Sequence, residues 1–281
     1  MSNNHKKNQL ILDVGFASDA NPRFRCSMED SHVLMKSFLN QDSKALYAIF
    51  DGHGGRDAAD QIAQTFPEIF ANHLKTLGEE QMHEVWRLTH QEVDEKLDEQ
   101  AMQFQGAAAV SCFFSLNPNG TKNVYASNLG DARAVLCLPN KQEPIRLTYD
   151  HKASDRKEIQ RITDAGGFVI ASRVQGILSV SRALGDHGLK PFVSIVPHSK
   201  NIELTQSDLN EVRRPFVIIA CDGLWDVFTD AEAVDIAKLE LNEQSPKTEG
   251  KTPAERMAKR LVEEALRGGS TDNISVIVVI L

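Results

Sequence analysis

Carboxylate side chains recur beside apolar stretches of this 281-residue chain. Asp51, Asp222 and Asp272 lie in ALYAIFDGHGG, PFVIIACDGLWDV and STDNISVIVVIL, and we interpret each acid as lying at the downstream end of a buried strand. A single Asp-Gly is ordinarily a turn signal, because Asp caps its own backbone and Gly permits positive φ. Three such acids together favour a shared site over three unrelated turns.

Glu29 and Asp30 form a fourth acidic group, just before an expected strand at 32–36. Two carboxylates about 4 Å apart repel each other by roughly 4 kcal/mol at an effective dielectric constant near 20, so such a cluster needs a cation. Oxygen ligands without paired His or Cys favour a hard ion, Mg²⁺ or Mn²⁺, over zinc. Ions of this kind serve phosphate chemistry.

The composition excludes several classes of partner. Lys and Arg number 31 and Asp and Glu 39, and the resulting net charge of -8 argues against nucleic acid or an anionic membrane as the main partner. The four cysteines lack CxxC or His-paired zinc spacing. No stretch approaches the ~18 apolar residues of a membrane span, and the N-terminus lacks the features of a signal peptide. We therefore expect the protein in the cytoplasm, the nucleus or both. We also expect it to be a monomer.

Hydrophobic periodicity predicts the elements that must position these acids. Strands are expected at 9–16, 32–36, 45–50, 110–116, 123–127, 133–138, 215–221 and 274–281, the last of them central. Helices are expected at 56–77 with a kink at Pro67, at 79–104, at 154–165 with Ser154 as N-cap, and after capping boxes at 229–232 and 252–255.

Strands dominate both ends of the chain and helices come in pairs between them. This order favours two packed sheets covered by helices over a βαβ array. Residues 1–8 are expected to be disordered, 242–251 to form a loop, and about 150–196, which has weak strands, to form an appended flap. Residues 9–281 would then form a single domain.

Six motifs along the chain carry a resemblance to a known family. They are RCSMED (25–30), FDGHGG (50–55), NLGDAR (128–133), VSRALGD (180–186), CDGLWDV (221–227) and STDN (270–273). In this order they closely resemble the metal-dependent protein phosphatases of type 2C, from about residue 10 to the C-terminus. The resemblance implies an α+β fold, a four-layer αββα sandwich in which helix pairs flank two mainly antiparallel sheets, with a small flap subdomain.

The resemblance also assigns metal ligands. It implies that Asp51 bridges two Mg²⁺ or Mn²⁺ ions, with Asp222 and Asp272 on one ion and the carbonyl of Gly52 on the other. Two such ions roughly 3.5–4 Å apart can deprotonate a bridging water and stabilise an in-line attack on phosphorus.

Further acids complete this set. The resemblance implies that Glu29 holds metal-bound water, and Asp30 belongs to the same group of metal-site acids. Asp131 and Asp226, together with Asp222, match the weaker third metal site that some members of the family show. Without the family, Asp131 would be interpreted as a turn residue.

Two basic residues receive roles in the chemistry. The planar guanidinium group of Arg25 can donate hydrogen bonds to two phosphate oxygens at once. His53, two residues after Asp51, is the candidate general acid for the departing Ser or Thr oxygen. The alternatives are that Arg25 is an ordinary surface residue and that His53 has only a structural role.

The implied activity is the hydrolysis of phosphoserine and phosphothreonine in phosphoprotein substrates, by a metal-bridging hydroxide and without a covalent intermediate. One departure leaves an alternative open. Where the family carries Gly, Ser or Thr, Thr and Ala, this chain has Gly106, Ala107, Ala108 and Ala109, so that both hydroxyls are missing. A pseudophosphatase that binds phosphoproteins with little or no turnover is one rival, and a structural metal-binding domain is another.

Overall fold

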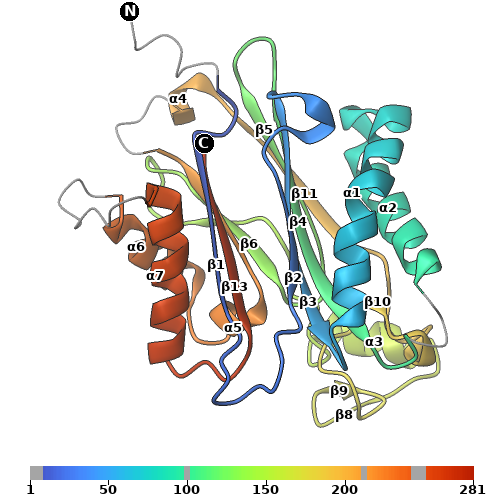
Figure 1. Cartoon of the computed structure of the whole chain (residues 1–281). Coiled ribbons are helices and arrows are strands. Elements are labelled where there is room, and N and C mark those ends of the chain that lie inside the picture. Colours follow the sequence, from blue (N-terminus) through green and yellow to red (C-terminus); the bar gives the residue numbers. More distant parts are fainter. Residues whose placement is uncertain (1–8, 98–101, 210–213, 242–250) are drawn as a thin grey trace, which may run out of the picture.

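The computed structural model describes residues 9–97, 102–209, 214–241 and 251–281 (Figure 1). The predictions for residues 1–8 and for nearly all of the loop at 242–251 fall outside this part of the chain. Two β-sheets pack face to face, and helices cover the outer face of each (Figure 1). The αββα sandwich expected from the sequence is confirmed.

The first sheet has the strand order β1-β13-β12-β6-β7, and its neighbouring strands are all antiparallel. Its last strand in sequence, β13, is buried along its whole length between β1 and β12, which confirms the prediction of a central strand. The strands are β1 (Asp13–Asp19), β6 (Arg133–Cys137), β7 (Ile145–Arg146), β12 (Phe216–Ala220) and β13 (Ile274–Ile280).

The second sheet has the order β11-β5-β4-β3-β2, again antiparallel throughout. A short strand, β10, pairs with the first two residues of β4, beyond the point where β5 has ended. The strands are β2 (Ser31–Met35), β3 (Lys44–His53), β4 (Gly106–Leu116), β5 (Lys122–Leu129), β10 (Leu184–Gly185) and β11 (His198–Leu204).

Helices α1 and α2 cover the second sheet, while α5, α6 and α7 cover the first (Figure 1). Both predicted capping boxes are present, at the start of α6 and of α7. The α-helices are α1 (Asp57–Leu77), α2 (Met82–Lys96), α3 (Arg156–Asp164), α4 (Gln206–Leu209), α5 (Asp222–Trp225), α6 (Asp230–Leu239) and α7 (Pro253–Arg267), and the 3-10 turns are η2 (Phe38–Asn40), η3 (Glu79–Gln81) and η4 (His187–Leu189).

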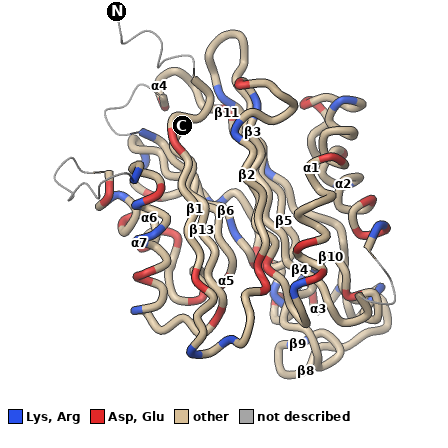
Figure 2. Tube along the Cα trace, in the orientation of Figure 1, with Lys and Arg blue, Asp and Glu red and all other residues tan. Residues whose placement is uncertain are grey.

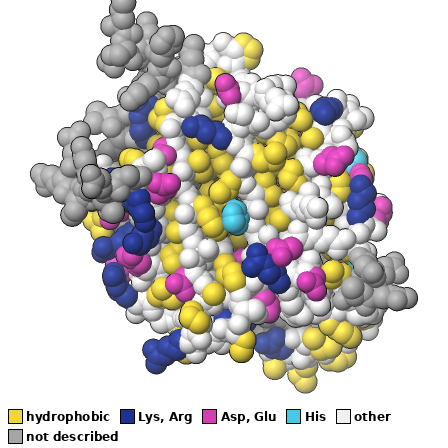
Figure 3. Space-filling view, viewed as in Figure 1, with side chains coloured by type: hydrophobic (Ala, Val, Ile, Leu, Met, Phe, Trp, Pro, Cys, Tyr) yellow, Lys and Arg dark blue, Asp and Glu magenta, His cyan; other side chains and the backbone are white. Residues whose placement is uncertain are grey.

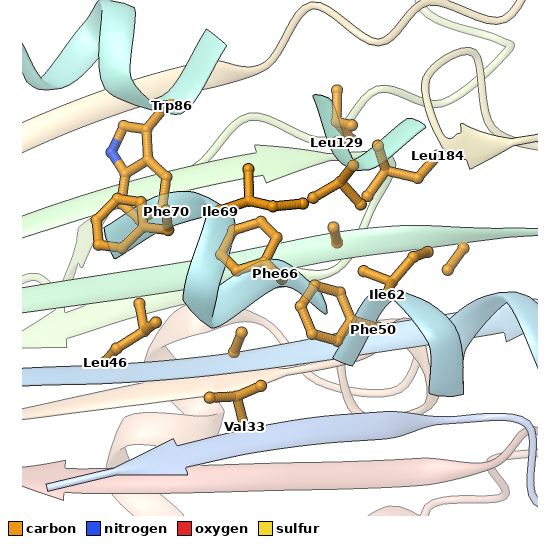
Figure 4. Packing of buried hydrophobic residues seen from close by; sticks show 14 of the residues in the cluster. Val33, Leu46, Phe50, Ile62, Phe66, Ile69, Phe70, Trp86, Leu129 and Leu184 are labelled. Atoms are coloured by element: carbon orange, nitrogen blue, oxygen red, sulfur yellow. The ribbon is translucent and has the colours of Figure 1, made fainter. Parts of the chain in front are cut away.

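Separate hydrophobic clusters fill the spaces between the layers. Under α1 and α2 the aromatic rings of Phe50, Phe66, Phe70 and Trp86 pack together (Figure 4). The rings of Phe70 and Trp86 stack with centroids 4.4 Å apart. This packing fixes the outer helices on the sheet that carries Asp51.

The same cluster contains a buried histidine with an acid-sensitive contribution to stability. The Nδ1 of His90 donates to the carbonyl oxygen of Trp86 at 2.7 Å, Nε2 has no partner, and burial lowers the pKa of His90 to about 4. Between the ordinary value of 6.5 and about 4 only the unfolded chain takes up this proton, so stability is lost as the pH falls through this range.

We expect wild type to lose up to about 3 kcal/mol more than His90→Leu when the pH is lowered from 7 to 4. Urea unfolding at both pH values measures this difference. Replacement of the exposed His83 on the same helix is the control. An unchanged pH dependence in His90→Leu would contradict the prediction.

Several predicted boundaries are wrong: β4 begins at Gly106 rather than at 110, β3 extends to His53 rather than ending at 50, and three others also differ. The first strand covers Asp13–Asp19 rather than 9–16. Helix α2 ends at Lys96 instead of continuing to 104, because Leu97 is extended and the chain must turn back to enter β4. The N-cap of α3 is Asp155 rather than Ser154, since the Asp155 carboxylate accepts from the backbone N–H groups of Lys157 and Glu158.

The segment between β7 and β11 forms the flap beside the sandwich. It contains α3 and the hairpin of β8 (Val169–Ile170) and β9 (Arg173–Val174), and it has a small hydrophobic cluster of its own. Phe168, Ile170 and Ile177 are exposed there, and Figure 3 shows hydrophobic side chains where Figure 1 places this hairpin. Among the described residues, no helix is long and apolar enough to cross a bilayer.

Candidate metal centre

A pocket of about 210 Å³ opens between the ends of the two sheets. Acidic positions lie at the lower ends of both sheets in Figure 2. The lining residues come from both sheets, from the flap and from the loop before β2: Arg25, Asp51, Gly52, His53, Ala108, Asp131, Arg173, Leu178, Ser179, Val180, Asp222 and Asp272.

The three acids that first indicated a site meet here from different elements. Asp51 lies within β3, Asp222 is the first residue of α5 after β12, and Asp272 comes just before β13. The interpretation of Asp272 as downstream of its strand is therefore wrong. Because β13 runs antiparallel to β12, the start of β13 lies beside the end of β12, and both acids reach the same pocket.

Electrostatic repulsion marks the centre of the cluster. Burial raises the pKa of Asp51 well above its usual value, and the charges of Asp222, Asp30, Asp131 and Asp272 raise it further. Burial likewise raises the pKa of Asp222, with contributions from Asp131 and Asp272. These carboxylates can ionise together only when positive charge enters the pocket.

Asp30 lies near Asp51 and Cys221, and only 4% of its surface is exposed. Burial raises its pKa to about 6; Ser275, Cys221 and Asp51 lie near enough to favour the charged form, but neither carboxylate oxygen makes a hydrogen bond of normal geometry. Ligand atoms of Asp30, Asp51 and Cys221 lie within 4.8 Å of one another. A buried carboxylate without a partner fits a place beside a cation.

The sulfur of Cys221 already takes part in two hydrogen bonds. It accepts a hydrogen bond from the backbone N–H of Ser275 at 3.1 Å and lies 3.4 Å from the carbonyl oxygen of Asn273, to which its thiol donates. Burial raises the pKa of the Cys221 thiol, and nearby carboxylates raise it further. The thiol therefore stays protonated, and the oxygen donors remain the ligand set.

Glu29 lies on a loop held by Asn273, but its side chain does not line the pocket: its carboxylate accepts from the backbone N–H of Gly55 at 3.2 Å and from the hydroxyl of Ser27 at 2.9 Å. The side chain of Asn273 accepts from the backbone N–H of Glu29 at 2.8 Å and donates to the carbonyl oxygens of Ala20 and Ser27. A Cβ at Gly52 would lie 2.3 Å from the carbonyl oxygen of Glu29, so only glycine permits this approach of the loop to β3. Asn273 was not among the predicted site residues, although it ends the STDN motif.

The acids expected at a third metal site lie around a lysine. Asp131 is buried and its pKa is raised to about 6, chiefly by burial and against the opposing charge of Lys152. The Lys152 Nζ lies 2.8 Å from Oδ1 of Asp226 and 3.9 Å from Oδ2 of Asp131. Sequence analysis missed Lys152, because no local pattern placed its ammonium group between these acids.

Arg25 and His53 lie at the rim of the pocket. The Arg25 guanidinium donates to the Asp272 carboxylate and, through Nε, to the carbonyl oxygen of Thr271 at 3.2 Å. His53 uses Nε2 to contact the Asp186 carboxylate at 2.7 Å. Asp186 was also missed, although it is the last residue of the VSRALGD motif.

The two alanines that depart from the family pattern lie on opposite faces of β4. Ala107 packs into the hydrophobic cluster under α1 and α2, whereas Ala108 belongs to the cluster between the sheets and also lines the pocket. Ala108 pairs with Asp51 in the strand register. Only Ala108 therefore lies where a missing hydroxyl bears on the acids.

The donor set fits hard divalent cations. The acids around Asp51 outnumber two basic groups that contact them, Arg25 at Asp272 and Lys152 at Asp226 and Asp131. Carboxylate and carbonyl oxygens are the ligands that Mg²⁺ and Mn²⁺ prefer. Fold and site together define an α+β sandwich protein with a candidate site for divalent metal ions.

Comparisons with known proteins identify the family. A family model described as Protein phosphatase 2C matches residues 14–274. The chain is 38% identical over 268 residues to Protein phosphatase 2C homolog 1 of Schizosaccharomyces pombe, covering 95% of this chain and 72% of the relative. It is 34% identical to Protein phosphatase 2C homolog 1 of Saccharomyces cerevisiae, covering 97% and 94%.

Its fold is similar to the crystal structure of serine-threonine phosphatase 2C from Toxoplasma gondii, with a TM-score of 0.74 at 24% identity over 95% of this chain and 94% of that one. The chain belongs to the protein phosphatase 2C family.

Proposed function

We propose that this protein is a Mg²⁺- or Mn²⁺-dependent phosphatase that removes phosphate from serine and threonine residues of phosphoproteins. The observation that carries the proposal is the meeting of Asp51, Asp222 and Asp272 in one pocket whose rim holds Arg25 and His53. When bound, two divalent ions would supply an activated water and neutralise charge during in-line attack on phosphorus. No covalent enzyme intermediate is required.

The residues of the chain have separate tasks in this reaction. Asp51, Asp222 and Asp272 would hold the ions, together with the carbonyl of Gly52, while Glu29 would hold metal-bound water and Asp30 would lie beside the ions as a further acid of the site. Arg25 would bind two phosphate oxygens, and His53 would protonate the leaving oxygen. Asp131 and Asp226, together with Asp222, would hold a third ion.

One assay tests the proposal directly. Purified protein is expected to hydrolyse a phosphothreonine peptide with Mn²⁺ and to lose that activity with EDTA. Stoichiometric binding of the phosphopeptide without turnover would instead identify the pseudophosphatase suggested by Ala107 and Ala108. A metal-induced rise in melting temperature without any activity or phosphopeptide binding would identify a structural metal-binding domain.

Arg25→Ala should weaken recognition of the phosphate group. A charge-assisted hydrogen bond contributes about 1.5–3 kcal/mol, so we expect kcat/KM for a phosphothreonine peptide to fall about 10–100-fold. Arg23→Ala is the matched control, because Arg23 lies two residues away and contacts the ring of Phe24. Equal losses in the two variants would show that Arg25 has no specific part in binding phosphate.

A further inference from the structure

We propose that Asp186 is the positioning residue of His53, holding its Nε2 so that Nδ1 faces the leaving oxygen of the substrate. This inference rests on the proposed function, in which His53 protonates that oxygen. The carboxylate of Asp186 lies 2.7 Å from Nε2 of His53, and Asp186 is only 1% exposed. The His53 side chain itself is 27% exposed and lines the pocket.

Three neighbouring strands bring the two side chains together. His53, the last residue of β3, pairs with Gly106 on β4, and Gly106 pairs on its other side with Gly185 of β10. Asp186 follows directly after Gly185. The histidine and the carboxylate therefore meet across the start of β4, although 133 positions separate them in the sequence.

Glycine at position 106 makes this meeting possible. A Cβ built there would lie 2.2 Å from Oδ2 of Asp186, which is the oxygen that contacts His53, and 2.6 Å from the carbonyl oxygen of Leu184. Any side chain at this position would push the carboxylate away from the imidazole. The absence of a side chain at Gly106 therefore helps to orient His53.

The backbone around Asp186 is fixed from two directions. The N–H of Asp186 donates to the carbonyl oxygen of Gln105 at 2.8 Å, and the N–H of Gly185 donates to the buried carboxylate of Asp94 on α2 at 2.7 Å. Asp186 adopts a left-handed conformation with φ 52° and ψ 41°, which aspartate tolerates better than most residues. Strained conformations held in this way concentrate at functional sites.

The contact between Nε2 of His53 and Asp186 determines which nitrogen of the imidazole can act on the substrate. With Nε2 donating to Asp186, Nδ1 is the nitrogen left to carry a proton to the substrate. As the bond from phosphorus to the leaving oxygen breaks, this proton goes to that oxygen and the alcohol departs, while the oxygen of the attacking water bonds to phosphorus. The proton lost by the water passes to solvent, and His53 takes up a proton from solvent for the next cycle.

Asp186→Asn tests the role through the choice of substrate. The amide can present its NH₂ to Nε2 and favour the wrong tautomer. General acid catalysis contributes about 10²–10⁴-fold, so we expect about a 100-fold loss on a phosphothreonine peptide, whose alkoxide must be protonated. p-Nitrophenolate leaves without a proton, so we expect less than about a 3-fold loss on p-nitrophenyl phosphate.

A double variant and a control complete the series. Because the two residues act as one unit, His53→Gln/Asp186→Asn should lose no more activity than His53→Gln alone. Glu92→Gln is the matched control: it removes the charge from another histidine–carboxylate pair, 2.9 Å from Nε2 of His73, and should leave both activities unchanged. Equal losses by Asp186→Asn on both substrates, or multiplying losses in the double variant, would overturn the proposal.

A measurement on wild type does not depend on the folding of an Asp186 variant. Histidine ¹⁵N NMR at alkaline pH, with the signals of His53 assigned by their loss in His53→Gln, should show the proton on Nε2. A proton on Nδ1 would overturn the pairing. If wild type with Mn²⁺ hydrolyses no phosphopeptide, the proposed function fails by itself, while the tautomer still decides whether Asp186 holds His53.

Discussion

Asp51→Asn should remove nearly all phosphatase activity. Asp51 is the acid on which the charges of Asp222, Asp30, Asp131 and Asp272 converge, and it is the residue expected to join two ions. Bound metal contributes several kcal/mol of charge stabilisation to the transition state, so the loss in kcat should be about 10³-fold or more. Asp222→Asn is expected to be nearly as inactive.

The same substitution should stabilise the metal-free protein. Without metal, Asp51 must either take up a proton on folding or stay ionised beside the other acids, and Asn at this position removes that cost of about 1–4 kcal/mol, which urea unfolding in EDTA at pH 7 measures. Asp60→Asn is the control, because Asp60 is an exposed acid on α1 that pairs with Arg56 at 2.8 Å. An Asp51→Asn protein that keeps more than a tenth of wild-type activity would show that this carboxylate does not hold the catalytic ions.

The acid cluster should make the metal-free protein less stable as the pH rises from 4 to 7, which opposes the effect of His90. Asp30 and Asp131 have a pKa of about 6 in the folded protein against an ordinary value of 3.8, so the folded state keeps protons that the unfolded chain has already released. Their stabilising effect is complete below the unfolded value and is lost as the pH rises through about 6. Each shift corresponds to at most about 3 kcal/mol.

Divalent metal should reverse this trend, because cations bind the ionised carboxylates and release their protons. Melting temperature measured across this pH range should therefore depend on pH more negatively in EDTA than in Mn²⁺, because the contribution of His90 is common to both conditions. Asp30→Asn should bring the slope in EDTA closer to the slope in Mn²⁺. Parallel curves with and without Mn²⁺ would contradict the prediction.

Local sequence signals predicted much of the fold. The almost wholly apolar run at 274–281 predicted β13 as a central strand, and the Thr–Glu spacing predicted the starts of α6 and α7. These features depend on neighbours a few residues away. The end of α2 could not be predicted in the same way, because helical periodicity continues past Lys96 while the second sheet requires the chain to turn back toward Gly106.

The candidate site shows the same difference between features that local sequence predicts and features that depend on distant segments. The acids could be found from motifs, but their partners come from distant segments that only the sheet register brings near. Asp186 reaches His53 across Gly106, and Lys152 reaches Asp226 from the flap. No periodicity or spacing in the sequence relates these pairs, so only the assembled structure reveals them.

The place of β13 inside the first sheet sets the order in which a growing polypeptide can become an enzyme. Within the described residues, β1 pairs with no strand other than β13, and Asp272 comes just before that strand. The ribosome completes the second sheet at β11, and the roughly 70 residues from the end of β11 to Asp272 take about 3–14 s to synthesise. During that interval the nascent chain holds Asp51 without Asp272, so the acid cluster can be complete only after Asp272 has been translated.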